Sequence, residues 1–394
     1  MPRVLRIINR FNLGGPTYNA AYLSKYMAPE FETLLVGGAN DETEENSEFI
    51  VRNLGLEPLS IPEMKRPISL KDDLTAYYKL RKIIRDFKPD IVHTHAAKAG
   101  ALGRRAAHYL KVPVIVHTFH GHVFDAYFGS MQSTFYQQLE RRLAKMSTKI
   151  IAISENQKYD LVHKYRICPE EKVEIIPLGF DLGRFNENID IKRIAFRKKY
   201  QIEEDEIAIG IVGRIVPIKN HAMFLKSIAL LKEKTQRNIR VFVVGDGELI
   251  NEVVANTTEL GLDYTFFDAN YKKASITFTS WIKDIDEVNA GMDIIALTSL
   301  NEGTPVSLIE AQASNKPIVT TDVGGIANVV IPNKTAFLCE SGNHEQFADY
   351  LLQLVDNDQL RIDMGIEGWD FVREKFHYQR LVNDMKNFYN RLLV

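Results

Sequence analysis

Residues 207–225 read IAIGIVGRIVPIKNHAMFL. The first six are apolar and mostly β-branched, which is typical of a buried strand, and His221, Phe224 and Leu225 begin a helix-period pattern. Similar short runs alternate with helical segments through both halves of the chain. This alternation predicts parallel sheets with helical crossovers. The expected fold class is therefore α/β, with two doubly wound domains.

Further strands are expected on both sides of the middle of the chain. Candidates in the first half include Val4–Asn9, Glu32–Val36, Ile91–His95, Val114–Thr118, Lys149–Ile153 and Val173–Pro177. Those in the second half include Ile207–Val212, Arg240–Val244, Ile276–Thr279, Ile294–Leu297, Ile318–Thr321 and Ala336–Leu338. Open parallel sheets bind ligands beyond the carboxyl ends of their strands, so we expect a cleft between the facing loops of the two domains.

The boundary between the domains is expected near residue 180. The loop Pro177–Asp181 closes the first series of strands and leads into a polar segment. This gives domains at residues 1–180 and 181–378. The final helix, residues 379–394, has an apolar stripe of Leu381, Met385, Phe388 and Leu392. We expect it either to seal the core of the second domain or to cross back to the first.

The composition is that of a soluble globular protein, with 394 residues, 45% hydrophobic and 25% charged. Two cysteines suit a reducing, cytosolic compartment, and the beginning of the chain resembles a strand rather than a signal peptide. The overall charge of −2 argues against a nucleic-acid partner. Arg81, Lys82, Arg85 and Lys88 nevertheless cluster on an expected helix. There they form either a solvated face or a contact with anionic lipid or a phosphorylated acceptor.

Residues 300–311, LNEGTPVSLIEA, place two carboxylates around the start of an expected helix. Thr304 is a good N-cap and Pro305 suits the first helical position. Glu302 then lies on the loop and Glu310 about two turns into the helix. Gly303 permits close approach of a ligand, and the unpaired amides around Val306 and Ser307 can hold an anion. The segment is either a socket for hydroxyls and phosphates or a capped surface helix with solvated glutamates.

Two cations and several glycines suggest sites for anions. Arg214 and Lys219, on the loop after the strand Ile207–Val212, either converge on a diphosphate or remain solvated. Gly245, after another strand, offers tight backbone near a nucleotide. Gly14 and Gly15 can bring amides to an anion, although they do not form a dinucleotide-binding fingerprint.

No metal is expected. His117, His120 and His122 follow one strand and His93 and His95 end another, but no cysteine or carboxylate completes a zinc spacing. Asp284 and Asp286 have the spacing of a metal-diphosphate pair. They precede a helical turn, which favours helix capping.

Taken together, these landmarks resemble the retaining glycosyltransferases of family 4, which have the GT-B fold of two Rossmann-like domains. The resemblance covers nearly the whole chain and rests on landmarks in order: Gly14–Gly15, Thr118–Gly121, Pro177–Asp181, Gly213–Arg214 with Lys219, and Glu302–Glu310. The combination is specific, whereas each part alone is not. It implies an acceptor-side N-terminal domain and a C-terminal domain that binds a nucleotide sugar.

The resemblance also implies roles for the donor-side residues. Arg214 and Lys219 would hold the diphosphate, Glu302 the sugar hydroxyls and Glu310 the ribose, with the amides of Gly303, Thr304, Pro305 and Val306 nearby. Trp281 and Ile282 would contact the base, beside Gly245.

In the first domain, His120 would lie near the C6 side of the sugar and the reacting bond. Gly14 and Gly15 would face phosphate or acceptor, and His95 with Lys98 would line the acceptor side. No cofactor is implied.

A metal-independent mechanism follows from charge. Cleavage of the anomeric bond builds negative charge on the departing diphosphate, which Arg214, Lys219 and the helix amides would stabilise. Family resemblance implies retention of configuration by front-face attack. The first expectation is a UDP-sugar donor, UDP-N-acetylglucosamine or another UDP-hexose, and a glycan or lipid-linked acceptor at the inner face of the membrane.

Two other functions remain open. A non-hydrolysing nucleotide-sugar 2-epimerase has the same architecture and would convert the donor without an acceptor. A sugar-nucleotide-binding protein without turnover is the non-enzymatic alternative. His120→Ala distinguishes the last from a transferase, because only the transferase would lose its rate.

Overall fold

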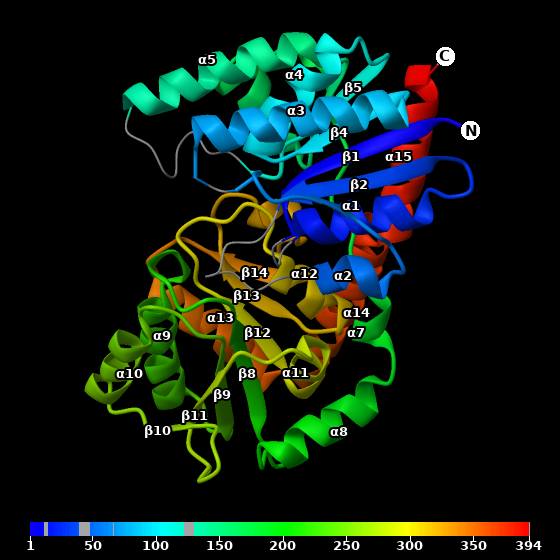
Figure 1. Ribbon diagram of the computed structural model, residues 1–394. Helices are drawn as coiled ribbons and strands as arrows, with labels where there is room; N and C mark the ends of the chain where they lie inside the picture. The colour runs from blue at the N-terminus through cyan, green and yellow to red at the C-terminus, as the bar shows by residue number, and fades with distance from the viewer. Residues whose placement is uncertain (12–14, 39–47, 66, 122–129, 394) are drawn as a thin grey trace. The chain divides into compact units, whose positions relative to one another are not determined.

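The computed structural model describes residues 1–11, 15–38, 48–65, 67–121 and 130–393. The chain divides into two units, each built around one parallel sheet (Figure 1). The N-terminal unit comprises Met1–Phe180 and Phe376–Val394, and the C-terminal unit comprises Asp181–Lys375. The division after Phe180 coincides with the boundary expected from the sequence. The last segment of the chain returns to the first unit.

The sheet of the N-terminal unit has seven strands in the order β3-β2-β1-β4-β5-β6-β7. Their bounds are β1 Arg3–Arg10, β2 Glu32–Gly38, β3 Leu59–Ile61, β4 Ile91–His95, β5 Val114–Thr118, β6 Lys149–Ala152 and β7 Val173–Ile175. β1 pairs in parallel with β2 on one side and with β4 on the other. Successive connections therefore diverge between β1 and β4.

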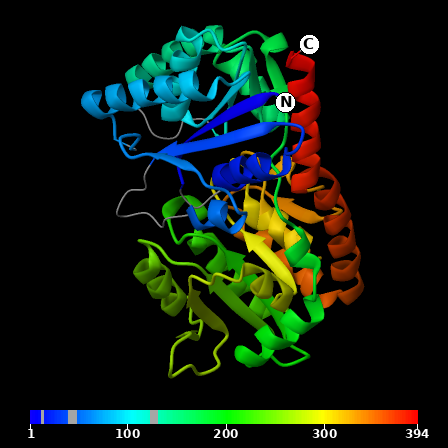
Figure 2. The ribbon, with the colours of Figure 1, turned by 45° about the vertical axis from the view of Figure 1, so that its right-hand side comes forward.

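Helices cover both faces of this sheet (Figures 1 and 2). They are α1 Gly15–Tyr26, α2 Glu48–Asn53, α3 Leu70–Phe87, α4 Ala97–Tyr109, α5 Ser130–Met146, α6 Glu155–Tyr159 and α15 Tyr378–Leu393. Val4 of β1 packs with Leu23 of α1 and Met385 of α15, whereas the next residue, Leu5, packs with Leu80 of α3. Because successive side chains of a strand point to opposite faces, α1 and α15 lie on one face and α3 on the other.

The final helix completes the core of the first unit. Leu381, Met385 and Phe388 of the expected apolar stripe are buried there, and Leu392 is partly buried beside them. Figure 2 shows α15, in red, beside the blue α1. Of the two positions left open by the sequence, the crossing back to the first domain is the one observed.

The C-terminal unit repeats the architecture, with seven strands in the order β10-β11-β9-β8-β12-β13-β14. The strands are β8 Ile207–Val212, β9 Ile239–Val244, β10 Tyr264–Phe266, β11 Ile276–Ser280, β12 Ile294–Leu297, β13 Ile318–Thr321 and β14 Ala336–Cys339. The helices are α7 Gly183–Asn186, α8 Ile189–Lys199, α9 His221–Lys234, α10 Ile250–Glu259, α11 Ile285–Gly291, α12 Val306–Ala313, α13 His344–Asp356 and α14 Asp358–Phe376. β8 lies between β9 and β12, so the connections diverge between β8 and β12.

The expected α/β class and the two doubly wound sheets are confirmed, with two strands added. β3 and β10 are edge strands of three residues, too short to give a periodic signal. The helix after Glu302 begins at Val306, with Pro305 at the N-cap, so the expected positions of Thr304 and Pro305 were each one residue too early. Asp284 is the N-cap residue of α11 and Asp286 lies in its first turn, as expected for acids at the start of a helix, although the Asp284 side chain makes no capping hydrogen bond.

Candidate active site

The carboxyl edge of the C-terminal sheet gathers the residues expected to bind a donor. The loop after β8 carries Arg214 and Lys219, and the loop after β12 carries Glu302. Because β8 and β12 are neighbours at the point where connections diverge, these two loops lie side by side. The Nζ of Lys219 is 2.5 Å from Oε1 of Glu302. Residues 83 positions apart in the sequence therefore meet at the switch point of the sheet.

The backbone of the β8 loop positions Lys219. Pro217 begins a short 3-10 helix, Pro217–Lys219, and Asn220 adopts a left-handed conformation with φ of 48° before α9 begins. A Cβ on Gly213 would lie 3.5 Å from Cε of Lys219, so the lysine stem runs over this glycine. Arg214, next to Gly213, is exposed. Among the described residues its guanidinium has no ion-pair partner, which leaves its charge available to a ligand.

Only glycine fits at position 245. A Cβ at this position would lie 2.0 Å from the carbonyl oxygen of Gly213, so no larger residue fits between the loops after β8 and β9. The N–H of Gly245 also donates to the carbonyl of Ser280, at 3.0 Å. Trp281 and Ile282 follow Ser280 directly, and Trp281 is 59% exposed. The expected base-binding segment therefore adjoins the β8 loop through Gly245.

Glu302 is fixed by side-chain and backbone contacts. Its Oε1 accepts hydrogen bonds from Lys219 and from the hydroxyl of Ser299, the latter at 2.6 Å. Its carbonyl accepts from the N–H of Gly325 at 2.8 Å. A Cβ on Gly324 would lie 2.1 Å from that same carbonyl, so the loop after β13 packs directly behind Glu302. Both donors converge on one carboxylate oxygen, which leaves Oε2 without a donor among the described residues.

The start of α12 presents backbone to the same edge. Gly303 is exposed, and a Cβ there would meet no atom within 4 Å. Thr304 and Pro305 connect it to Val306, the first residue of α12. The N–H groups of the first turn have no preceding turn of helix to bond to, and they carry the positive end of the helix dipole. They can therefore bind an anion beside Lys219 and Glu302.

Glu310 projects from α12 into a poorly hydrated position. Burial raises the pKa of its carboxyl to about 7. The positive charge of Arg184 acts to lower this pKa, and the negative charge of Asp286 acts to raise it. Asp286 is itself paired with Lys192 at 2.9 Å. Among the described residues, no hydrogen-bond donor reaches the Glu310 carboxylate. A ligand hydroxyl that donated to Glu310 would supply the missing bond and would lower the pKa of its carboxyl.

The expected first-domain residues form a separate group at the carboxyl edge of the N-terminal sheet. His95 ends β4 and His120 follows β5, and Nδ1 of His95 is 2.9 Å from Nε2 of His120. Burial lowers the pKa of His120 to about 4 and that of His95 well below its usual value. Both rings are therefore neutral at physiological pH. The Nδ1 of His120 is buried and has no hydrogen-bond partner among the described residues.

Beneath these two rings lies a buried arginine that sequence reasoning missed. Arg6 of β1 is 0% exposed, and its Nη1 donates to Nδ1 of His93 at 3.0 Å and to the hydroxyl of Tyr389 at 3.3 Å. His93 stacks on His95, with ring centroids 4.2 Å apart. Because guanidinium can only donate, His93 carries its proton on Nε2, 2.7 Å from Thr118 Oγ1. The signal was a charged residue between Leu5 and Ile7, inside an apolar strand.

The remaining first-domain candidates have other contacts or lie outside the description. The Nζ of Lys98 is 2.6 Å from Oδ1 of Asp73, so its charge is already compensated within the unit. Gly15 is the first residue of α1, and its carbonyl accepts from the side chain of Asn19 at 2.8 Å. Gly14 and His122 lie outside the described residues. Within those residues, no group of three or more His, Cys, Asp or Glu side chains could hold a metal ion.

The raised pKa of Glu310 predicts a pH-dependent effect of Glu310→Gln on stability. Below pH 4.5 the carboxyl is protonated in both the folded and unfolded states. As pH rises toward about 7 the unfolded state ionises first, so the wild type loses up to about 3 kcal/mol of folding free energy. Urea unfolding should find the variant more stable at pH 8 and little changed at pH 4.5. Glu374→Gln, at an exposed position of α14, is the control, and an equal response of both variants would contradict the assignment.

Comparison with known proteins connects both units to one family. Residues 13–184 match the family described as Glycosyltransferase Family 4, and residues 192–369 match Glycosyl transferases group 1. The chain is 31% identical to the UDP-Gal:alpha-D-GlcNAc-diphosphoundecaprenol alpha-1,3-galactosyltransferase of Escherichia coli, covering 85% of this chain and 84% of that one. It is 28% identical to the capsular polysaccharide biosynthesis glycosyltransferase CapM of Staphylococcus aureus, covering 84% of each.

Solved structures share the fold at lower identity. HepE of Anabaena, crystallised in complex with UDP, superposes with a TM-score of 0.82 at 17% identity, over 99% of this chain and 100% of that one. A glycosyltransferase of Rickettsia africae gives a TM-score of 0.77 at 20% identity, over 100% and 98% of the two chains. Both sheets and nearly every residue are thus accounted for by one architecture. The chain belongs to glycosyltransferase family 4 and is a glycosyltransferase of the GT-B fold.

Proposed function

We propose that this glycosyltransferase moves a hexose or N-acetylhexosamine from a UDP-sugar to a glycan or lipid-linked acceptor, with retention of configuration and without a metal ion. The observation that carries the proposal is the contact between Lys219 and Glu302 beside the first turn of α12. It places a cation, a carboxylate and free amides at the switch point of one sheet. UDP is favoured because the Escherichia coli relative is named for UDP-Gal and the HepE crystals contain UDP.

The ion pair suggests how the donor is received. In the free protein Glu302 neutralises Lys219, at 2.5 Å. A diphosphate brings two negative phosphates to Arg214 and Lys219 and can replace the carboxylate as the partner of the lysine. Glu302 is then released to accept hydrogen bonds from sugar hydroxyls, with Ser299 keeping the carboxylate oriented. The sugar site therefore forms at the moment when the donor binds.

The same groups stabilise the departing diphosphate. The bond from the anomeric carbon to the diphosphate oxygen breaks, and the acceptor oxygen forms its bond on the same face of the sugar. The acceptor proton passes to a phosphate oxygen of the leaving group. Negative charge on the diphosphate is met by Arg214, Lys219 and the α12 amides, which are already in place before the reaction. Glu302 acts as a sugar ligand and does not form a covalent intermediate.

The nucleoside and the acceptor side follow the family resemblance. Glu310 accepts from ribose hydroxyls, which supplies the donors that its carboxylate lacks in the free protein. The backbone at Trp281 and Ile282 contacts the base. His120 hydrogen-bonds the sugar through Nδ1, because its Nε2 is occupied by His95. As a neutral ring His120 adds no positive charge that would oppose positive character on the anomeric carbon.

The first test is turnover of nucleotide sugars by Lys219→Met. We expect wild-type protein to bind and slowly hydrolyse a UDP-hexose without acceptor, and to transfer the sugar when acceptor is supplied. Removing the lysine charge should lower kcat/KM by about 10²–10³-fold, the usual effect of losing one preorganised group on a leaving oxygen. Lys226→Met, at an exposed position of α9, is the matched control. Equal rates for the two variants would exclude a role of Lys219 in the reaction.

His120→Ala separates a transferase from a binding protein, and an assay without acceptor separates it from an epimerase. A transferase should lose at least about tenfold in rate, because a hydrogen bond to bound sugar is removed. A binding protein without turnover would keep its affinity and its function, and an epimerase would convert the donor sugar without acceptor. His108→Ala, at an exposed position of α4, controls for loss of a histidine elsewhere. Product stereochemistry, read by NMR of the anomeric proton, tests retention directly.

An anionic membrane surface is proposed as the site of action on the basis of α3. Leu70, Leu74 and Tyr78 recur every four residues along one side of this helix and are 88%, 55% and 57% exposed. Arg85 continues the same side toward the end of α3. An apolar stripe that ends in positive charge matches the boundary between lipid tails and anionic headgroups. No described helix is long and apolar enough to span a bilayer.

The structure changes which basic residues belong to this surface. Lys82 is paired with Asp86 at 2.7 Å, and the Arg81 guanidinium lies 3.9 Å from the ring centre of Tyr109. Both charges therefore already have a partner within the N-terminal unit. Arg85 and Lys88 remain exposed, without a carboxylate partner among the described residues. The apolar stripe therefore has to supply most of the affinity.

Sedimentation with vesicles tests the α3 surface. Leu74→Asn should reduce binding to vesicles that contain phosphatidylglycerol several-fold, because one apolar side chain no longer enters the interface. Arg85→Glu should reduce it further at low salt. Ile366→Asn, on α14 of the other unit, is the control, since Ile366 is 54% exposed and thus matches Leu74. Binding unaffected by both α3 substitutions would exclude this helix as the membrane contact.

A further inference from the structure

A basic hollow lies on the N-terminal unit, away from the carboxyl edge of its sheet. Its volume is about 520 Å³, and its walls are the last turns of α5 and the segment that leads into β7. α5 ends just before β6, and Lys172 lies just before β7, so the hollow is at the amino edge of the sheet. His120, by contrast, follows the carboxyl end of β5. The hollow is thus separate from the groups assigned to the transfer reaction.

Five cations line the hollow and no acidic residue does: Arg141, Arg142, Lys145, Arg166 and Lys172. None of the five makes an ion pair with a carboxylate among the described residues. Like charges held together without counter-ions repel one another and lower stability, so a purely structural role does not account for the cluster. The arrangement is favourable once an anion occupies the hollow.

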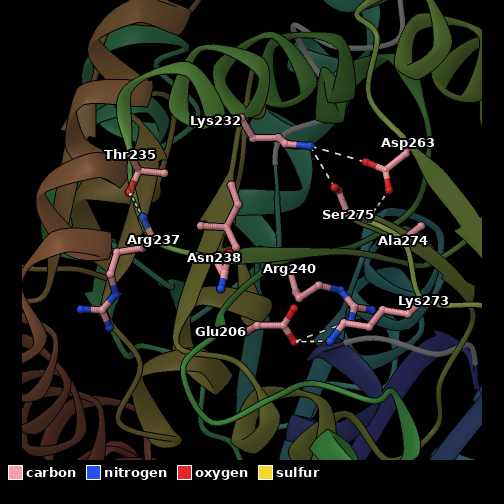
Figure 3. A pocket seen from close by; sticks show the side chains of 11 residues that line it. Glu206, Lys232, Thr235, Arg237, Asn238, Arg240, Asp263, Lys273, Ala274 and Ser275 are labelled. Atoms are coloured by element: carbon pink, nitrogen blue, oxygen red, sulfur yellow. Dashed lines mark hydrogen bonds and ion pairs between the residues drawn. The ribbon is translucent and has the colours of Figure 1, made fainter.

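The hollow of the C-terminal unit provides the contrast (Figure 3). It is also at the amino edge of its sheet, has a volume of about 340 Å³ and is lined by Lys232, Arg237, Arg240 and Lys273. Two acids share those walls. Figure 3 shows Asp263 reaching toward Lys232, at 3.5 Å, and Glu206 toward Lys273, at 3.0 Å. Positive charge in that hollow is compensated internally, whereas in the N-terminal hollow it is not.

Two of the five cations build the walls of the basic hollow. Nε of Arg141 donates to the carbonyl of Arg166 at 2.9 Å, and Nζ of Lys172 donates to the carbonyls of Ala144 and Ser147 at 3.0 and 2.8 Å. These bonds tie the end of α5 to the segment before β7. Carbonyl oxygens are neutral, so the positive charges remain.

The other three cations, Arg142, Lys145 and Arg166, are exposed, and their side chains make no hydrogen bond or ion pair with the described residues. They are free to turn toward an anion. Arg142 and Arg166 can each give two parallel hydrogen bonds to a phosphate, and Lys145 a point charge.

Apart from Gln138, the rest of the lining is apolar. Val162 and Ile167 contribute to the wall, and the thiol of Cys168 is kept neutral because burial raises its pKa to about 11. A small hydrated anion would make no use of this surface. An anion joined to an apolar group would bury it against these side chains while its charge met the arginines.

We propose that this hollow binds the phosphate of a phosphorylated amphiphile, at a site distinct from the one that binds the sugar donor. The bound phosphate contacts Arg142, Lys145 and Arg166, and the adjoining apolar part contacts Val162 and Ile167. The phosphate can belong to a lipid headgroup in a membrane or to a free phosphate ester. This proposal does not depend on the reaction proposed above.

Titration calorimetry with inorganic diphosphate tests the phosphate site on the full-length protein. Arg142→Glu and Lys145→Glu should each weaken binding at the hollow at least about tenfold, the effect of removing one charge-assisted contact. Arg105→Glu, an equal change of charge at an exposed position of α4, should leave it within about twofold. Any diphosphate bound at Arg214 and Lys219 is common to all four proteins, so their difference reports the hollow alone. Circular dichroism melting identifies a variant that has lost its fold, and Lys145→Gln then replaces it.

Vesicle binding distinguishes the two sources of phosphate. If vesicles that contain phosphatidic acid bind the wild type and release Arg142→Glu, while neutral phosphatidylcholine vesicles bind neither, the ligand is a membrane headgroup. If diphosphate binding depends on Arg142 and vesicle binding does not, the ligand is a free phosphate ester. Equal binding of diphosphate and of vesicles by wild type, Arg142→Glu and Arg105→Glu would overturn the proposal.

Discussion

The contact between Lys219 and Glu302 is possible only because β8 and β12 are neighbours in the sheet. In the sequence these two strands are separated by β9, β10 and β11. In this sheet the first and fifth strands of the unit lie side by side, and the connections that follow them diverge, which leaves room for a ligand at their carboxyl ends. Glycines then determine how closely the loops approach. Without Gly245 and Gly324, the backbones behind Arg214 and Glu302 could not come into contact. The charge arrangement is thus a consequence of strand order and of two missing side chains.

In the N-terminal unit the electrostatic constraint is that buried histidines have to be neutral. Three histidines of β4 and β5, His93, His95 and His117, are buried, which would be costly if any carried charge. Burial lowers the pKa of His93, His95 and His117 well below the ordinary value. The positive charge of the Arg6 guanidinium lowers the pKa of His93 and His95 further. The unit thereby holds His120 at the end of a rigid stack of neutral rings.

Much of the fold could be predicted from the sequence because central parallel strands are buried on both faces and leave continuous apolar runs, as in Ile207–Val212. Edge strands such as Tyr264–Phe266 leave no such run. The loops that carry Arg214 and Glu302 were predictable from strand ends and turn residues. Other features were not, because they depend on tertiary packing: the glycine contacts at Gly245, the compensation of Lys98 by Asp73, and Arg6 inside β1.

The return of α15 to the N-terminal unit has a consequence for biosynthesis. Met385 and Phe388 share a core with Val4, and Tyr389 caps the side chain of Arg6. A ribosome that makes the chain from its first residue finishes every strand of the C-terminal unit before these side chains emerge. The domain translated second can therefore reach its native state first. Until α15 emerges from the exit tunnel, one flank of the sheet in the domain translated first stays uncovered.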